Sequence, residues 1–159
     1  MQTVHETAFF IRQVGDGLDG KQSAPVWYRG FYSMISRLFA NIVTVRVFSN
    51  RFELRNIDTG KQASVVSEKP FTTPRLLVGQ FTEAERALKQ GMKQLQEGGW
   101  FSRSPVVLIQ PMEKTEGGLS QVEERILQEL ALGAGARRAV IWVGEVLTDQ
   151  QVRDKCRRG

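Results

Sequence analysis

The sequence predicts an α/β protein whose mixed sheet is built in the order βββ-α-β-α-β. Three segments rich in β-branched residues and separated by turns lie within residues 42–67. Two later segments carry apolar residues at helical spacing, and each of them is followed by a short apolar segment. A meander followed by strands that alternate with helices implies a mixed sheet covered by those helices.

The three N-terminal strands are predicted from residue type and alternation. Residues 42–48 (IVTVRVF) are mostly β-branched, and Ser49-Asn50 supplies a turn. In residues 51–56, charged and apolar side chains alternate, which is typical of a half-exposed strand. Asp58-Thr59-Gly60-Lys61 predicts a hairpin turn into residues 62–67, and it lacks the glycine spacing of a P-loop.

The first helix is expected to begin at a capping box formed by Thr82 and Glu85 and to stop at Gly98-Gly99. Its predicted inward residues are Ala84, Leu88, Met92 and Leu95. The wholly apolar segment 106–109 then predicts a strand buried on both faces.

The second helix repeats the capping-box pattern at Ser120 and Glu123, and Gly133 and Gly135 are expected to end it. Its predicted inward residues are Val122, Ile126, Leu127 and Leu130. Residues 139–143 predict the last buried strand, and a weaker helical pattern covers residues 148–155.

The chain divides into three predicted parts. Residues 1–26 lack sustained periodicity and predict a mobile leader, residues 27–146 the domain, and residues 147–159 a basic C-terminal tail. Within residues 27–39, helical spacing gathers a basic and aromatic face that either contacts a membrane or partner or packs on the core; composition favours the core. The candidate contact residues are Trp27, Arg29, Phe31, Met34, Arg37 and Leu38.

The net charge and the counts of histidine and cysteine limit which classes of partner and catalytic site are expected. The formal net charge of +5 favours anionic partners, although the densest basic cluster lies in the tail and is typical of a solvated end. That cluster is Arg153, Lys155, Arg157 and Arg158. One cysteine (Cys156, expected as a surface thiol) excludes an internal disulfide, and with one histidine it excludes a Cys/His metal cluster. The histidine, His5, lies in a poorly patterned N-terminal segment, which argues against a Ser/His triad. We expect no cofactor, and a cytoplasmic location because no apolar run approaches the ~20 residues of a membrane span.

Three stretches resemble the bacterial actin homologue MreB, of the actin-like (ribonuclease-H-like) group. Gln121–Arg125 (QVEER), followed by Leu132–Arg137 (LGAGAR), is similar to the MreB helix that reads QVERR and then GAGAR before a buried strand. Residues 104–109 resemble the strand that enters this helix, and Phe39-Ala40-Asn41 resembles the segment before the first strand. The resemblance spans residues 27–146 and implies one actin-like subdomain.

The same comparison implies that nucleotide hydrolysis is absent. Actin-like ATPases carry an acidic, glycine-containing phosphate loop between their first two strands. Here the acidic position falls on Arg46 and the glycine on Phe48. An arginine cannot organise hydrated Mg²⁺, and a phenylalanine blocks close backbone approach to a phosphate. The second phosphate loop and the adenosine-binding subdomains of MreB would lie beyond residue 146, where this sequence soon ends.

These observations favour a non-catalytic, MreB-like protein that acts in cytoskeletal or envelope-associated assembly. It would bind a protein partner or itself, with peripheral contact to an anionic inner membrane left open. The alternative is a basic nucleic-acid-binding module that uses Arg46, Arg51, Arg55 and Phe48, with Phe52 placed on the opposite face by strand alternation. An enzyme with an unrecognised site ranks last.

Overall fold

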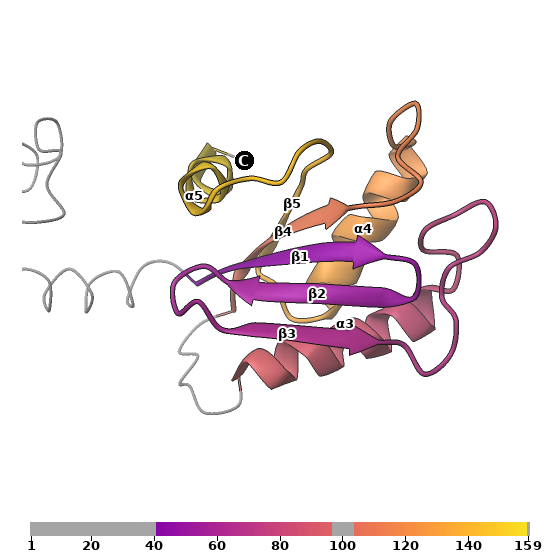
Figure 1. Cartoon of the computed structure of the whole chain (residues 1–159), viewed down its shortest axis with the longest axis horizontal. Helices are drawn as coiled ribbons and strands as arrows, with labels where there is room; N and C mark the ends of the chain where they lie inside the picture. The colour runs from indigo at the N-terminus through magenta and orange to yellow at the C-terminus, as the bar shows by residue number, and fades with distance from the viewer. Residues whose placement is uncertain (1–40, 97–103, 159) are drawn as a thin grey trace, which may run out of the picture. The chain divides into compact units, whose positions relative to one another are not determined.

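A computed structural model describes residues 41–96 and 104–158 (Figure 1). The strands are β1 (Ile42–Phe48), β2 (Arg51–Asn56), β3 (Gln62–Val66), β4 (Val106–Pro111) and β5 (Arg138–Ile141). The helices are α3 (Phe81–Gln96), α4 (Gln121–Gly133) and α5 (Asp149–Arg158). The predicted α/β class and the element order βββ-α-β-α-β are confirmed, and the weaker helical pattern at residues 148–155 corresponds to α5.

The strands form one five-stranded mixed sheet in the order β3-β2-β1-β4-β5. The pairs β1–β2 and β2–β3 are antiparallel, whereas β1–β4 and β4–β5 are parallel. Two-residue and short turns suffice for the antiparallel hairpins, but each parallel pair needs a crossover, and α3 and α4 supply these. The hairpin predicted at residues 58–61 joins β2 to β3, with Gly60 at φ 74°.

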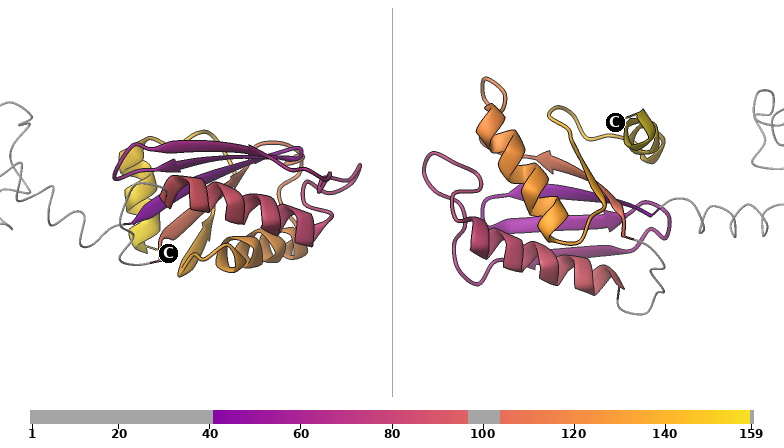
Figure 2. Two further views of the ribbon diagram at one scale, coloured as in Figure 1. Left: turned by 90° about the horizontal axis from the view of Figure 1, so that it is seen from below. Right: turned by 180° about the vertical axis from the view of Figure 1, so that it is seen from behind.

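The main core lies between one face of the sheet and the helices α3 and α4 (Figure 2). Alternation in β1 sends Val43, Val45 and Val47 to this face, where all three are fully buried. Leu88 of α3 and Leu130 of α4 pack into the same cluster. Burial of this contiguous apolar set is the main force that holds both helices on the sheet.

A second, smaller core lies where α5 packs on the opposite face. Its members come from three strands or their ends and from α5: Ile42, Ile57, Val106, Leu108, Val152 and Cys156. The predictions that residues 147–159 form a solvated tail and that Cys156 is a surface thiol are therefore wrong. Because Val152 and Cys156 are four residues apart, they lie on one face of the helix, where they are 2% and 4% exposed. Burial raises the pKa of the Cys156 thiol, and the nearby Arg138 charge partly opposes this.

The two helix starts differ from each other. Ser120 Oγ accepts from the Glu123 N–H at 3.3 Å and Glu123 Oε2 accepts from the Ser120 N–H at 2.9 Å, so this capping box is confirmed. The hydrogen bonds from the Ser120 hydroxyl and N–H lower the pKa of Glu123. The box predicted at Thr82 and Glu85 is wrong, because α3 begins at Phe81 and Thr82 already lies in its first turn.

Two burial predictions also fail. Val122 is 68% exposed, because the helical period places it on the side of α4 away from Leu127 and Ala131, which face the core. Only Leu127, Leu130 and Ala131 of α4 are buried. Strand β5 is half-buried along its whole length rather than buried, since it lies at the edge of the sheet.

Several predictions fall outside the described residues. These are the leader at 1–26, the contact face within 27–39 and the helix stop at Gly98-Gly99. Within residues 41–96 and 104–158, no helix is both long and apolar enough to cross a membrane.

Candidate functional site

The sheet face opposite α3 and α4 is only partly covered, and beside α5 it forms an open depression of about 570 Å³. A volume of this order is typical of small-molecule sites. The strands contribute mainly polar side chains to it: Thr44, Arg46, Glu53, Arg55, Gln62, Ser64 and Gln110. The segment before α5 and the helix itself contribute Val146, Leu147, Asp149 and Val152.

Strand alternation explains which of the predicted residues reach this open face. Phe52 points to the main core, where it is fully buried and stacks on Phe71 with ring centroids 4.9 Å apart. Its neighbours on β2 face the other way. Beside the depression, the Arg51 guanidinium lies 4.2 Å from the centroid of the Phe48 ring.

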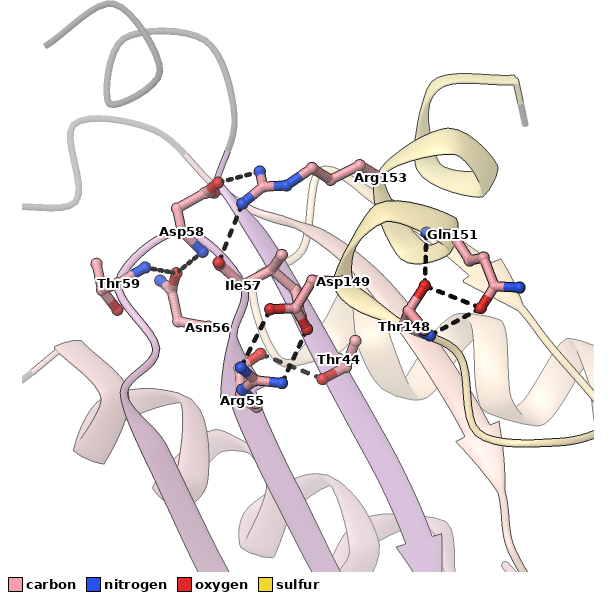
Figure 3. A network of polar contacts seen from close by, with 10 residues as sticks. All are labelled: Thr44, Arg55, Asn56, Ile57, Asp58, Thr59, Thr148, Asp149, Gln151 and Arg153. Atoms are coloured by element: carbon pink, nitrogen blue, oxygen red, sulfur yellow. Dashed lines mark hydrogen bonds and ion pairs between the residues drawn. The ribbon is translucent and has the colours of Figure 1, made fainter. Parts of the chain in front are cut away.

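Arg55 is held at the α5 side of the depression. Its Nη1 and Nη2 donate to the two carboxylate oxygens of Asp149 at 2.8 and 3.1 Å, which links β2 to the start of α5 (Figure 3). The Thr44 hydroxyl donates to the Arg55 carbonyl at 3.3 Å. Arg55 Nε is buried without a hydrogen-bond partner. Arg55 is thus oriented by an ion pair that sequence spacing gave no sign of.

Arg46 occupies the middle of the same face. Its cross-strand neighbours are Glu53 on β2 and Gln110 on β4. Glu53 is taken by Arg51, with Nη1 and Oε1 2.6 Å apart. The buried Gln110 amide donates to the carbonyls of Gly144 and Glu145, at 2.7 and 3.3 Å.

Both neighbours of Arg46 are therefore engaged elsewhere. Within residues 41–96 and 104–158, the Arg46 guanidinium makes no hydrogen bond and no ion pair, although the residue is half-buried. A guanidinium presents a planar fork of N–H donors that matches a carboxylate or a phosphate. Arg46 is accordingly the side chain on this face best placed to bind an anion.

The predicted basic cluster near the C-terminus is divided by the structure. Arg153 forms an ion pair with Asp58 and donates to the Ile57 carbonyl at 3.1 Å, so it fastens α5 to the end of β2 (Figure 3). The Lys155 ammonium lies 3.7 Å from the centroid of the Trp142 ring. Arg157 and Arg158 are exposed. Two of the four cations therefore serve the packing of α5.

The β1–β2 turn, where the MreB resemblance places a phosphate loop, is bound to other parts of the chain. The Ser49 N–H donates to Glu113 Oε2 at 3.1 Å, and the Ser49 hydroxyl donates to the same oxygen. Asn50, at φ 57°, accepts from the N–H groups of Phe71 and Thr72 with its side-chain oxygen, both at 2.8 Å. Among the residues that the structure describes, no group of three or more His, Cys, Asp or Glu residues could hold a metal ion.

The site was only partly visible in the sequence. Arg46, Arg51, Arg55 and Phe48 were singled out, and all four lie on or beside the open face. The missed residues are Glu53, Gln110 and Asp149. A polar Gln110 directly after four apolar residues was a signal for a special position, whereas the pairing of Asp149 with β2 depends on the docking of α5.

Comparison with known proteins finds similarity to an uncharacterized protein. No family model matches it. It is 32% identical over 99 residues to the uncharacterized protein YjaA of Escherichia coli strain K12, a match that covers 59% of this chain and 76% of YjaA. The chain belongs to the YjaA family. The function of this YjaA-family chain must therefore be argued from its own chemistry.

Proposed function

We propose that this YjaA-family chain is a non-catalytic, MreB-like binding protein that acts through protein–protein contact in cytoskeletal or envelope-associated assembly. The observation that carries the proposal is the open sheet face. Strands β1 and β4 are parallel, and parallel strands are normally covered on both faces. The depression leaves this pair only partly covered on one face, which favours an interaction surface.

The MreB part of the proposal is supported by where the similar residues lie. The QVEER segment opens α4 after a capping box, and the LGAGAR segment ends it immediately before β5. Gly135 in that segment has a φ of 99°, a conformation for which glycine is favoured. The same helix-to-strand order is what the resemblance implies.

The absence of catalysis is supported by the β1–β2 turn. A phosphate group would compete there with the Glu113 carboxylate for the Ser49 N–H, and the two anions would repel each other. On β1, Arg46 stands at the position that the resemblance assigns to the Mg²⁺-organising carboxylate. We therefore expect the protein to bind neither ATP nor Mg²⁺-ATP.

A direct test measures binding of the purified chain to purified MreB by analytical ultracentrifugation, with and without ATP. We expect complex formation that does not depend on nucleotide. It should be weakened by Ser64→Arg on the open face and unaffected by Gln90→Arg, a matched change of an exposed neutral side chain on α3. A strictly monomeric chain with affinity for neither MreB nor lipid would contradict the proposal.

The membrane part is tested separately with anionic liposomes. The six candidate contact residues between Trp27 and Leu38 motivate it, so the intact chain is compared with one truncated before Ile42. Co-sedimentation of the intact chain alone would support an interfacial anchor. If neither sediments, contact with lipid is ruled out and the protein contact must act alone.

A nucleic-acid-binding module is the second candidate. The specific observation in its favour is that Arg46 and the stacked pair of Phe48 and Arg51 share the open face. Cations beside a partly exposed aromatic ring such as Phe48 can bind single strands. The ion pairs of Arg51 and Arg55 reduce the free positive charge, which is why this candidate ranks second. A flat titration with single-stranded and duplex oligonucleotides at low salt would remove it.

A further inference from the structure

We propose that the depression beside α5 is a binding site for a small organic monocarboxylate, with Arg46 as the anchor for the carboxylate group. This goes beyond the proposed function, because a ligand site of this kind does not require any protein partner. Arg46 is the only arginine among the residues that line the depression whose guanidinium has no partner in the described chain. The depression has the size of a small-molecule site.

The charge balance of the site selects a ligand with one negative charge. The lining carries Arg46, Arg55, Glu53 and Asp149, and the charge of Glu53 is further countered by Arg51 at its edge. Three arginines against two carboxylates leave one positive charge, located at Arg46. A monocarboxylate cancels that charge, whereas a phosphate dianion would leave excess negative charge beside Glu53 and Asp149.

The neighbours of Arg46 define where the carboxylate would lie. Arg46 and Arg55 are diagonal neighbours on adjacent strands, because Arg46 is opposite Glu53 and Arg55 is opposite Thr44. Such positions are about 7–8 Å apart, within reach of long side chains. Asp149 holds the Arg55 fork in place, so Arg46 alone is free to form paired N–H···O bonds with a ligand.

The rest of the ligand would be apolar. Leu108 and Val152 form part of the lining from the small core, and Leu147 and Val146 extend it on the α5 side. Val146 is 51% exposed, although an apolar side chain is better buried. A carboxylate at Arg46 with a short hydrocarbon chain directed toward Val146 would satisfy both halves of the site.

The test follows backbone amide shifts by ¹⁵N NMR during titration with three probes. Hexanoate carries the carboxylate and the chain, hexanol only the chain, and inorganic phosphate only the anion. We expect hexanoate to bind roughly tenfold more tightly than either of the others, with shifts confined to β1, β2, β4 and the start of α5. Equal binding of hexanoate and hexanol, or no binding of hexanoate, would overturn the assignment.

The Arg46→Gln variant should weaken hexanoate binding roughly tenfold and leave hexanol binding unchanged. The matched control is Arg86→Gln, an exposed arginine on α3 whose partner is Glu83. Arg46→Lys keeps the charge without the fork and should give an intermediate affinity; it also serves if the glutamine variant fails to fold. Unchanged hexanoate affinity in a folded Arg46 variant would refute the role of Arg46.

A fourth probe tests whether the carboxylate comes from an acidic side chain of a protein instead of a small molecule. N-acetylglutamate amide mimics an acidic side chain of a protein. If it bound more tightly than hexanoate and with the same dependence on Arg46, the occupant would be an acidic protein segment and the small-molecule assignment would be wrong. Failure of all four probes would overturn this site and would have no bearing on the outcome of the MreB-binding experiment, so the two proposals fail separately.

Discussion

Asn50 offers a stringent test of how the β1–β2 turn organises the fold. Its side-chain oxygen accepts from the N–H groups of Phe71 and Thr72, both at 2.8 Å, and its own N–H donates to Thr72 Oγ1 at 3.0 Å. Its φ of 57° lies in the left-handed region, which asparagine tolerates better than most residues. Three substitutions separate the contribution of the side-chain hydrogen bonds from that of the left-handed backbone conformation.

The Asn50→Gly variant removes the acceptor but allows the backbone conformation. Two lost hydrogen bonds, at roughly 1 kcal/mol each, predict a loss of about 2 kcal/mol in the free energy of unfolding. Asn50→Ala loses the same bonds and should cost about 1–2 kcal/mol more than the glycine variant, because alanine, unlike glycine, places a Cβ in the left-handed region. Asn50→Asp keeps an acceptor in place and should cost less than about 1 kcal/mol.

Urea denaturation followed by far-UV circular dichroism measures the three values. The m-value should stay constant, since the surface exposed on unfolding is the same. The urea midpoint should be highest for the aspartate variant, lower for the glycine variant and lowest for the alanine variant. A glycine variant within about 0.5 kcal/mol of the parent would refute the claim that this side chain holds the chain at Phe71 and Thr72.

Four further outcomes are expected. Val152→Ala removes two buried methyl groups and should cost roughly 1.6 kcal/mol or more in urea denaturation, because Val152 is buried between α5 and the sheet. Asp149→Ala should cost less than about 1 kcal/mol, since its ion pair is partly exposed; a larger loss would contradict this. The raised pKa of Cys156 should make alkylation slow at pH 8 in the native state and fast in urea. The stability that a raised thiol pKa contributes is complete below the unfolded pKa of about 8.5 and is lost as pH rises through the folded value. The pKa of Glu123 is lowered in the folded state, so its ionised carboxylate stabilises the fold. The parent should therefore have a higher urea midpoint than Glu123→Gln above about pH 4.3, and this difference should vanish as pH falls through the folded pKa.

Local sequence signals were sufficient where neighbouring residues determine the structure. The bounds of β1 and β2 were predicted as the structure has them, because β-branched content and two-residue alternation report directly on strands. The capping box at Ser120 and the glycine after α4 followed from backbone hydrogen bonding within one turn. The α/β class followed from the order of these elements.

Predictions failed where a distant element decides the outcome. The exposure of Val122 depends on which side of α4 packs on the sheet, and the half-burial of β5 depends on its place at the sheet edge. The burial of Cys156 depends on which face of the sheet remained uncovered for α5. For the same reason the depression was not foreseen, since its polar lining is assembled from four strands and from Asp149, far along the chain.

The position of Asp149 and Val152 has a thermodynamic consequence. Both residues line the depression, and both belong to the helix that the small core holds against the sheet. Any ligand that binds only when α5 is docked stabilises the docked state, and the coupling free energy is reciprocal. The Cys156 thiol on the inner side of α5 is a built-in reporter of this equilibrium, because its labelling rate measures how often the helix detaches. Occupancy of the depression would thus be readable from the protection of a single sulfur atom that no ligand touches.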